Sequence, residues 1–557
     1  MSLDRSTLRW NGWGPLRHED AFARNNALWR FLGTALGGVE LPATPATPLA
    51  NCRLASPVLA FGDISPFQTA GCDVAIDAAD RAFHARGDSY RDLLALRAGH
   101  LDPLPDAIVY PKSAEACRGA IQAANAADIA VVPFGGGTSV VGGVSPLRGS
   151  HRAVVAIDTT KMDRLLSVDK ESMVATAEAG IYGPDLEQRL NAEGVMLGHF
   201  PQSFEFSTLG GWIAARGAGQ QSNRYGKAEH WLVSARLATP AGAWSTEGYP
   251  ASAAGARLTD LVAGSEGTLG IITDATFALH ECPAARDYRA YLFRSFAAGR
   301  EAVREIVQAG IPAASLRLSD EDETHFFGAL GRLQAPPKFK SRIEDSYLKL
   351  RGFGGAKCAM ITGAEGDAEL VAYARSRIAS IARKHGGLSV GTSPADRWFK
   401  GRFHGPYLRD PLMDRGLGVD TLETATSWSN LKRLYDAVRA ALLDAMKANA
   451  GVAGGRGICL AHISHSYVDG ASLYFTYVWP RARGGLDAEI AQWTAIKSAA
   501  SDAIAANGGT ISHHHGAGTD HAKWMAAEKG PVSMEVLRAL KSALDPKGIM
   551  NPGKLGL

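Results

Sequence analysis

Glycine runs that end in hydroxyl residues are the segments of this sequence best suited to holding an anionic ligand. The segment PFGGGTS, residues 133–139, directly continues the apolar run IAVVPF. Consecutive glycines let several backbone N–H groups converge on one anion because no Cβ blocks the approach, and a diphosphate suits such a loop. The spacing is not the Rossmann fingerprint, since Val140 stands where the third glycine is required. A plain glycine-rich turn explains this loop equally well when it is taken alone.

Two further loops of small residues lie in the same region. Residues 202–211 read QSFEFSTLGG, and residues 264–272 read GSEGTLGII. Three such loops within one region are hard to explain as independent turns. A single short motif often occurs by chance, but three in one region rarely do. We therefore interpret them as parts of one binding site.

Three adjacent histidines, His513, His514 and His515, form the second group able to do chemistry. In a strand the first and third would share a face. Imidazoles titrate near neutral pH, so the group suits acid/base catalysis or substrate orientation. A metal site is the alternative, but no carboxylate or cysteine accompanies the histidines locally, so we expect no metal. One functional histidine flanked by surface histidines is the third interpretation.

The elements that position these groups alternate between strand and helix. DAIVYP (106–111) predicts a strand, a helix follows with Ser113 as its N-cap, and IAVVPF (129–134) predicts a second strand that enters the glycine loop. Residues 231–246 predict a hairpin turned at 240–242. We expect a mostly helical N-terminal extension (1–101), a ligand-binding α/β domain (102–283), a mixed second domain (284–505) and a C-terminal segment (506–557) that returns to the site.

Composition narrows the class of protein. The 557 residues exceed one ordinary core. A net charge of +3, from 59 basic and 56 acidic side chains, gives no reason to expect nucleic acid. Six widely spaced cysteines predict reduced thiols. Without an apolar signal core or a long apolar run, a cytoplasmic protein is expected.

The order of the three loops resembles the vanillyl-alcohol-oxidase-type (PCMH-type) FAD-binding domain, and within that superfamily the alkyldihydroxyacetonephosphate synthase (alkylglycerone-phosphate synthase) family. The resemblance runs from the N-terminal region to the C-terminal tail. The segments that carry it, besides the loops, are WNGWG (10–14), SLRLSD (315–320), PYLRD (406–410), LETAT (422–426), SLYF (472–475) and SHHHGAG (512–518).

The resemblance implies an α+β protein, with a two-subdomain FAD-binding domain and an α+β cap domain built on an antiparallel sheet. It implies FAD held without a covalent bond, since Thr138 follows the third glycine where some relatives carry a tethering histidine. The residues implied to contact FAD are Pro133, Phe134, Gly135, Gly136, Gly137, Thr138, Ser139, Gln202, Ser203, Phe204, Glu205, Phe206, Ser207, Thr208, Gly211, Ala215, Arg216, Gly217, Ala218, Glu266, Gly267, Thr268, Leu269, Gly270, Ile271 and Ile272.

The resemblance also assigns roles to polar residues outside the loops. Arg409 is implied to bind a substrate phosphate, which a guanidinium can grip with two hydrogen bonds. Arg317 is a second candidate, although a structural ion pair explains it equally. Tyr474 is implied to be the general acid/base, whereas its position alone indicates an aromatic core residue of a strand. The three histidines are implied to be an activity-essential cluster beside the flavin.

The implied reaction exchanges the acyl group of acyl-dihydroxyacetone phosphate for a fatty alcohol through a flavin N5 adduct, a step of ether-lipid synthesis. A 2-hydroxy-acid oxidase or dehydrogenase on the same fold is the alternative. Relatives of that kind carry G-H-x-G-D-G-N-x-H and E-H-G-x-G, but G-D-G-N is missing here and His514 stands where the glutamate would be. A flavin carrier without catalytic activity is the third hypothesis.

Residues 330–355 mix basic and apolar side chains, which suits a lid, a peripheral membrane contact or a solvated loop. We expect a lipid-like phosphorylated substrate, a fatty alcohol and a homodimer.

Overall fold

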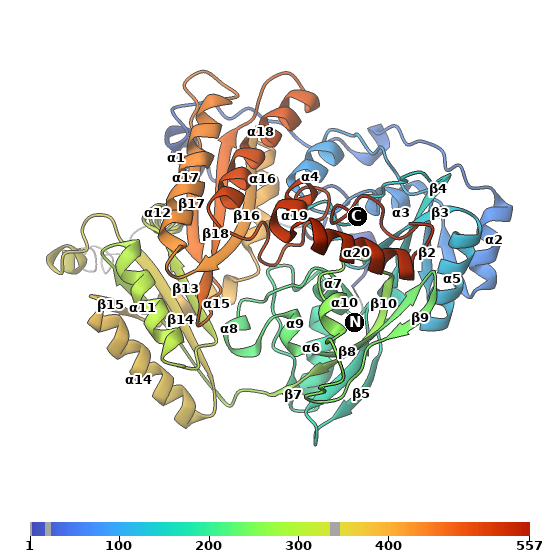
Figure 1. Ribbon diagram of the computed structural model, residues 1–557. Helices are drawn as coiled ribbons and strands as arrows, with labels where there is room; N and C mark the ends of the chain where they lie inside the picture. Colours follow the sequence, from blue (N-terminus) through green and yellow to red (C-terminus); the bar gives the residue numbers. More distant parts are fainter. Residues whose placement is uncertain (1–2, 17–23, 335–345) are drawn as a thin grey trace.

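The computed structural model describes residues 3–16, 24–334 and 346–557. Figure 1 shows two bodies, one built from the N-terminal half of the chain and the other from the yellow and orange segments, with the red C-terminal helices beside both. Among the described residues, no helix is both long and apolar enough to span a membrane.

The first sheet has the strand order β1-β2-β4-β3; strands β2, β4 and β3 are parallel, and the edge strand β1 is antiparallel to β2. Ser113 accepts a hydrogen bond from Ala116 N and starts the predicted helix α5, whose buried small face packs on this sheet. The elements are α2 (Phe61–Thr69), β1 (Cys72–Ala75), α3 (Ala78–Phe83), α4 (Tyr90–Arg97), β2 (Ala107–Pro111), α5 (Ala114–Ala126), β3 (Ile129–Phe134) and β4 (Ala153–Asp158).

The second sheet is antiparallel, with the order β5-β6-β10-β8-β9. Its apolar face packs beneath short helices, and the predicted hairpin at residues 240–242 is confirmed as the β8–β9 turn. Strands β7 and β11 pair with each other as a separate two-stranded sheet. The elements of this region are β5 (Leu165–Asp169), β6 (Val174–Glu178), α6 (Gly183–Ala192), β7 (Val195–Met196), α7 (Leu209–Ala214), α8 (Ser222–Tyr225), α9 (Ala228–Trp231), β8 (Leu232–Thr239), β9 (Gly242–Ser245), α10 (Thr259–Val262), β10 (Ile271–Ala278) and β11 (His280–Glu281).

The second body is built on a seven-stranded antiparallel sheet, ordered β15-β12-β14-β13-β17-β18-β16. Helices α11, α14 and α17 pack on it, and α18 packs on α17. The elements are β12 (Ala285–Phe293), α11 (Phe296–Gln308), β13 (Ser315–Ser319), α12 (Glu321–Gln334), β14 (Cys358–Gly366), α14 (Ala368–Lys384), β15 (Leu388–Gly391), α15 (Ser393–Gly401), α16 (Arg409–Met413), β16 (Leu417–Ser427), α17 (Leu431–Ala448), β17 (Ile458–Ile463), β18 (Gly470–Pro480) and α18 (Leu486–Ala506).

The C-terminal segment joins the two bodies. Helix α19 (Ala522–Lys529) contacts α18, and α20 (Pro531–Leu544) follows it. The last turn of the chain then reaches the first sheet, where Val131 N donates to Ile549 O at 2.8 Å. Residues 512–518 of this segment contact the glycine-containing loop 264–272, where Ala517 N and Gly518 N donate to Glu266.

The N-terminal region contributes a strand to the first sheet. It does contain helices, including α1 (Asn26–Ala35), but strand β1 pairs with β2 and so belongs to the first sheet. A four-residue strand leaves almost no periodic pattern, and its place is fixed by pairing with β2. The division at residues 101, 283 and 505 stays a prediction. Of the expected lid or membrane segment 330–355, residues 335–345 lie outside the described residues.

Candidate active site

A cavity of about 420 Å³ lies where the three glycine-containing loops face the seven-stranded sheet of the second body, called the cap sheet below. All of the loop 133–139 lines it, as do both candidate arginines, Tyr474, His514 and His515. The other predicted cofactor residues that line it are Gln202, Ser203, Ser207, Thr208, Gly211, Ala215, Gly217, Ala218, Glu266, Gly267, Gly270, Ile271 and Ile272.

Six predicted cofactor residues do not line the cavity. Phe204 and Phe206 are buried in aromatic contacts, and Leu269 is buried as well. Arg216 pairs with Glu229 at 3.4 Å. Thr268 donates to the Ser265 carbonyl. These five residues shape the loops. The sixth predicted residue that does not line the cavity is Glu205.

The first glycine loop is packed too tightly for side chains. A Cβ on Gly136 would lie 1.8 Å from the Phe206 carbonyl oxygen, and one on Gly135 would lie 2.4 Å from Thr208 Oγ1. Gly137 has a φ of +74°, which disfavours other residues. Bare backbone therefore faces the cavity, and this cradle fits the diphosphate of a dinucleotide cofactor such as FAD.

Arg5, which the sequence analysis did not single out, supports this loop from behind. Its guanidinium donates to the Gly135 carbonyl and pairs with the buried Asp158, and its Nε donates to Tyr182 Oη at 2.9 Å. The loop is thus tied to the N-terminal segment.

Glu266 joins the third glycine loop to residues 512–518, which we call the histidine loop. Its carboxylate accepts hydrogen bonds from Ala517 N at 2.6 Å and Gly518 N at 2.7 Å. Burial raises the pKa of Glu266 to about 7, although these two hydrogen bonds oppose the rise. The contact fixes residues 512–518 against the cavity.

Strand register places Tyr474 in the centre of a polar row. On β18 it pairs with His462 of β17 on one side and with Glu423 of β16 on the other. Directly opposed residues share a face of the sheet. The Tyr474 ring stacks on His462 at 4.8 Å between centroids and meets the edge of His515 at 5.7 Å. Burial raises the pKa of Tyr474 to about 12, so it is a neutral phenol at pH 7.

Glu323, another residue that the sequence analysis missed, anchors this row. Its Oε1 accepts from Arg317 at 3.1 Å and lies 2.9 Å from His462 Nδ1. Burial alone would raise the pKa of Glu323, but His462 and Arg317 bring it to about 2. Arg317 therefore both lines the cavity and forms the ion pair that the sequence left as an alternative.

Arg409 reaches the cavity from helix α16. Its guanidinium donates to the Asp88 main-chain carbonyl at 2.7 Å and lies 3.4 Å from Asp88 Oδ1. Burial raises the pKa of Asp88 to about 7, although Arg409 opposes the rise. The Asp88 main-chain carbonyl thus holds one edge of the Arg409 guanidinium, and other N–H groups of the guanidinium remain for a ligand.

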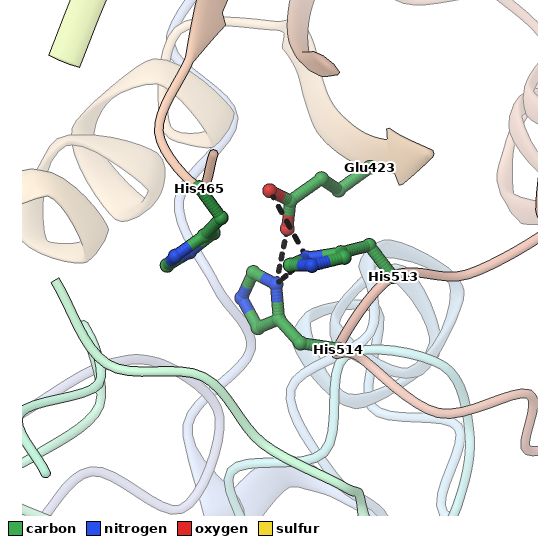
Figure 2. A group of neighbouring side chains, drawn as sticks. All are labelled: Glu423, His465, His513 and His514. Atoms are coloured by element: carbon green, nitrogen blue, oxygen red, sulfur yellow. Dashed lines mark hydrogen bonds and ion pairs between the residues drawn. The ribbon is translucent and has the colours of Figure 1, made fainter. Parts of the chain in front are cut away.

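The histidine run meets two residues from distant segments, Glu423 of β16 and His465 of the β17–β18 connection (Figure 2). Glu423 lies between His513, at 3.5 Å, and His514, and His465 stacks on His513 at 5.0 Å between centroids. Burial lowers the pKa of His513 to about 4 and that of His465 well below its usual range. The carboxylate absent from the local sequence is therefore supplied by β16. His513 itself does not line the cavity.

Comparisons with known proteins agree with this geometry. Residues 105–246 match the family model "FAD binding domain", and residues 282–555 match "FAD linked oxidases, C-terminal domain". The fold and site thus define a flavoprotein built from an FAD-binding domain and the C-terminal domain found in FAD-linked oxidases. A solved p-cresol methylhydroxylase structure, 16% identical with a TM-score of 0.65 over 91% of this chain and 99% of that chain, shares the fold.

The chain belongs to the alkyldihydroxyacetonephosphate synthase family. The synthase of Dictyostelium discoideum is 37% identical, over 85% of this chain and 77% of that protein, and that of Trypanosoma brucei brucei is 31% identical over 98% and 92%. A solved synthase structure superimposes with a TM-score of 0.84 at 32% identity, covering 99% of this chain and 100% of that chain. These findings confirm the resemblance, the fold class and FAD as the cofactor.

Proposed function

We propose that this protein is an FAD-dependent alkyl transferase that exchanges the acyl group of acyl-dihydroxyacetone phosphate for a fatty alcohol. One observation carries the proposal: Arg409, Arg317, Tyr474 and His515 line the same cavity as the glycine cradle. A flavin bound at the glycine cradle would thus have arginines nearby for a substrate phosphate, and Tyr474 and His515 nearby for proton transfer. The hydroxy-acid alternative has weaker support, since glycolate oxidase subunit GlcD of Bacillus subtilis (strain 168) is 25% identical over 81% of this chain and 89% of that protein.

The exchange moves no net electrons. The bond from the substrate carbon to the acyloxy oxygen breaks, a bond from that carbon to the alcohol oxygen forms, and the alcohol proton leaves with the carboxylic acid. FAD, held against the three glycine-containing loops, would supply a nucleophilic ring nitrogen for this exchange. The protein must bind phosphate and move protons.

Arg409 is proposed to bind the phosphate. Its contact with the Asp88 carbonyl orients the guanidinium, and a planar fork can then donate two parallel hydrogen bonds to phosphate oxygens. Arg317 is proposed as a second contact, held in place by Glu323.

Tyr474 is proposed to be the general acid/base. Its phenol is held between the His462 ring and the His515 edge, so the hydroxyl has a restricted orientation. The histidines of residues 513–515 are proposed to serve the same site. His515 acts at the cavity wall, where His514 also lies, while His513 supports them from behind.

The test supplies purified protein with acyl-dihydroxyacetone phosphate and a deuterated long-chain alcohol. Mass spectrometry is expected to find the deuterated alkyl ether and one equivalent of released fatty acid. The same substrate without its phosphate is the control, and it should react poorly. Absence of ether, together with flavin bleaching by a 2-hydroxy acid, would refute the proposal.

We further propose a cytoplasmic homodimer that touches membrane surfaces peripherally. Support for the membrane contact comes from apolar side chains beside the segment 335–345: Phe327 is 46% exposed, Tyr347 is 48% exposed and Leu350 is 85% exposed. Light scattering at micromolar concentration tests the dimer, and sedimentation with anionic vesicles tests the contact.

A further inference from the structure

Four side chains behind the cavity wall gather their donor atoms around one point (Figure 2). They are Glu423, His465, His513 and His514, and one ligand atom from each lies within 4.8 Å of all the others. Three are buried and His514 is half-buried. They come from three segments: β16, the β17–β18 connection and the histidine loop.

The spacing of these atoms matches a metal coordination shell. Zinc takes imidazole nitrogen at roughly 2.0–2.1 Å and carboxylate oxygen at roughly 2.0–2.2 Å, so tetrahedral ligand atoms lie about 3.3–3.5 Å apart. The Nδ1 atoms of His513 and His514 are 3.1 Å apart, and His513 Nδ1 is 3.5 Å from Glu423 Oε1. His514 Nδ1 also contacts the other oxygen of Glu423. Two of these separations are close to the edge of a tetrahedral shell, whereas His514 and Glu423 are in direct contact and would have to separate when an ion binds.

His465 provides an independent observation. His465 is buried, with 5% of the residue exposed, and its Nδ1 has no hydrogen-bond partner among the described residues. A buried ring nitrogen without a partner is unfavourable unless something else satisfies it. A cation bound by the other three residues would satisfy His465 as its fourth ligand.

The surroundings resemble the outer shell of a metal site. His513 Nε2 lies 2.6 Å from Tyr467 Oη, so the ring can direct its Nδ1 lone pair toward the cluster. Backbone also fixes the residue, since His513 N donates to the Glu423 carbonyl and Lys227 Nζ donates to the His513 carbonyl.

We propose that Glu423, His465, His513 and His514 form a zinc site that fastens the histidine loop to the cap sheet. Three imidazoles and one carboxylate are a donor set that zinc accepts, and its four ligands leave no position open. The ion is structural: of its ligands only His514 lines the cavity. Its role is to hold residues 513–515 in place. This assignment replaces the expectation of no metal, which rested on the lack of a local carboxylate.

The experiment uses FAD-loaded full-length protein stripped with a strong chelator. Titration with Zn²⁺ against a chromogenic competitor, and with Co²⁺ as a spectroscopic probe, should show one site per chain and the intense visible bands of tetrahedral cobalt. His465→Gln removes one ligand and should weaken Zn²⁺ binding at least 100-fold, whereas Tyr467→Phe should weaken it by about 10–100-fold as outer-shell changes do.

The matched control is His385→Gln. His385 also pairs with a glutamate, Glu305, at 2.7 Å, but its side chain is 21% exposed and it lies at the C-terminal end of α14, outside the cluster. It should bind Zn²⁺ like the unaltered protein. Bound-flavin absorbance and the melting temperature verify that each variant is folded. If the stripped, unaltered protein takes up no Zn²⁺, or if His465→Gln binds it equally well, the cluster is a metal-free hydrogen-bond network and the proposal is overturned.

Discussion

Asp88 is expected to oppose phosphate binding at Arg409. Its carboxylate lies 3.4 Å from the guanidinium, while the contact that holds Arg409 in place is with the Asp88 main-chain oxygen at 2.7 Å. Asp88→Asn keeps that main-chain contact and removes the charge. We therefore expect the variant to use phosphorylated substrate more efficiently.

The size of the effect follows from the geometry. A phosphate and a carboxylate on opposite sides of one guanidinium are roughly 6–7 Å apart, which at an effective dielectric constant of about 20 corresponds to about 2.5 kcal/mol. Access of solvent to the cavity reduces this to about 1–2 kcal/mol. The expected decrease in KM is therefore about 5–30-fold where Asp88 is ionised.

The pH dependence gives the sharper test. The pKa of Asp88 is raised to about 7, because burial outweighs the effect of Arg409. Its charge is present at pH 8 and largely lost at pH 6, so the KM ratio of the unaltered protein to the variant should be large at pH 8 and near one at pH 6. Ionisation of the substrate phosphate cancels in this ratio.

Steady-state kinetics at both pH values measure the ratio, and Asp80→Asn is the control. Burial also raises the pKa of Asp80, but its carboxylate accepts a hydrogen bond from Tyr110 and not from Arg409. An unchanged or higher KM for Asp88→Asn at pH 8 would show that the carboxylate orients Arg409 and does not compete with phosphate.

Three other outcomes are expected. Tyr474→Phe should lower turnover by about 10²–10⁴ with FAD still bound, measured by kcat and flavin absorbance; a loss below tenfold would contradict the acid/base role. Arg409→Ala removes a charge-assisted contact of roughly 1.5–3 kcal/mol and should weaken use of phosphorylated substrate by about 10–150-fold, with partial recovery in Arg409→Lys; equal losses with a substrate lacking phosphate would speak against the assignment. Acid precipitation should leave the yellow flavin in the supernatant, and a yellow pellet would mean a covalent link.

The cavity was predictable where its chemistry is local. The loop at residues 133–139 is readable because backbone needs glycine to approach an anion, and the cavity is lined by all seven of its residues. Arg5, Glu323 and His465 have no such signature. A single charged or imidazole side chain is ordinary in any sequence, and only the strand register and the path of the chain bring these residues to the site.

The expectation that the histidines bind no metal rested on local sequence alone and was limited in the same way. The absence of a carboxylate near residues 513–515 was a correct observation about the local sequence. Glu423 reaches the histidines because β16 runs beside the histidine loop, where His513 N donates to the Glu423 carbonyl. Long-range pairing of this kind leaves no trace in spacing.

Anaerobic turnover without an electron acceptor tests the central claim most directly. An exchange of acyloxy for alkoxy moves no net electrons, so acyl-dihydroxyacetone phosphate and a long-chain alcohol should give many equivalents of alkyl ether per flavin, with the flavin oxidised at the end. Product that stops at one equivalent with a bleached flavin, or bleaching by a 2-hydroxy acid with no ether formed, would contradict alkyl transfer and identify an oxidoreductase.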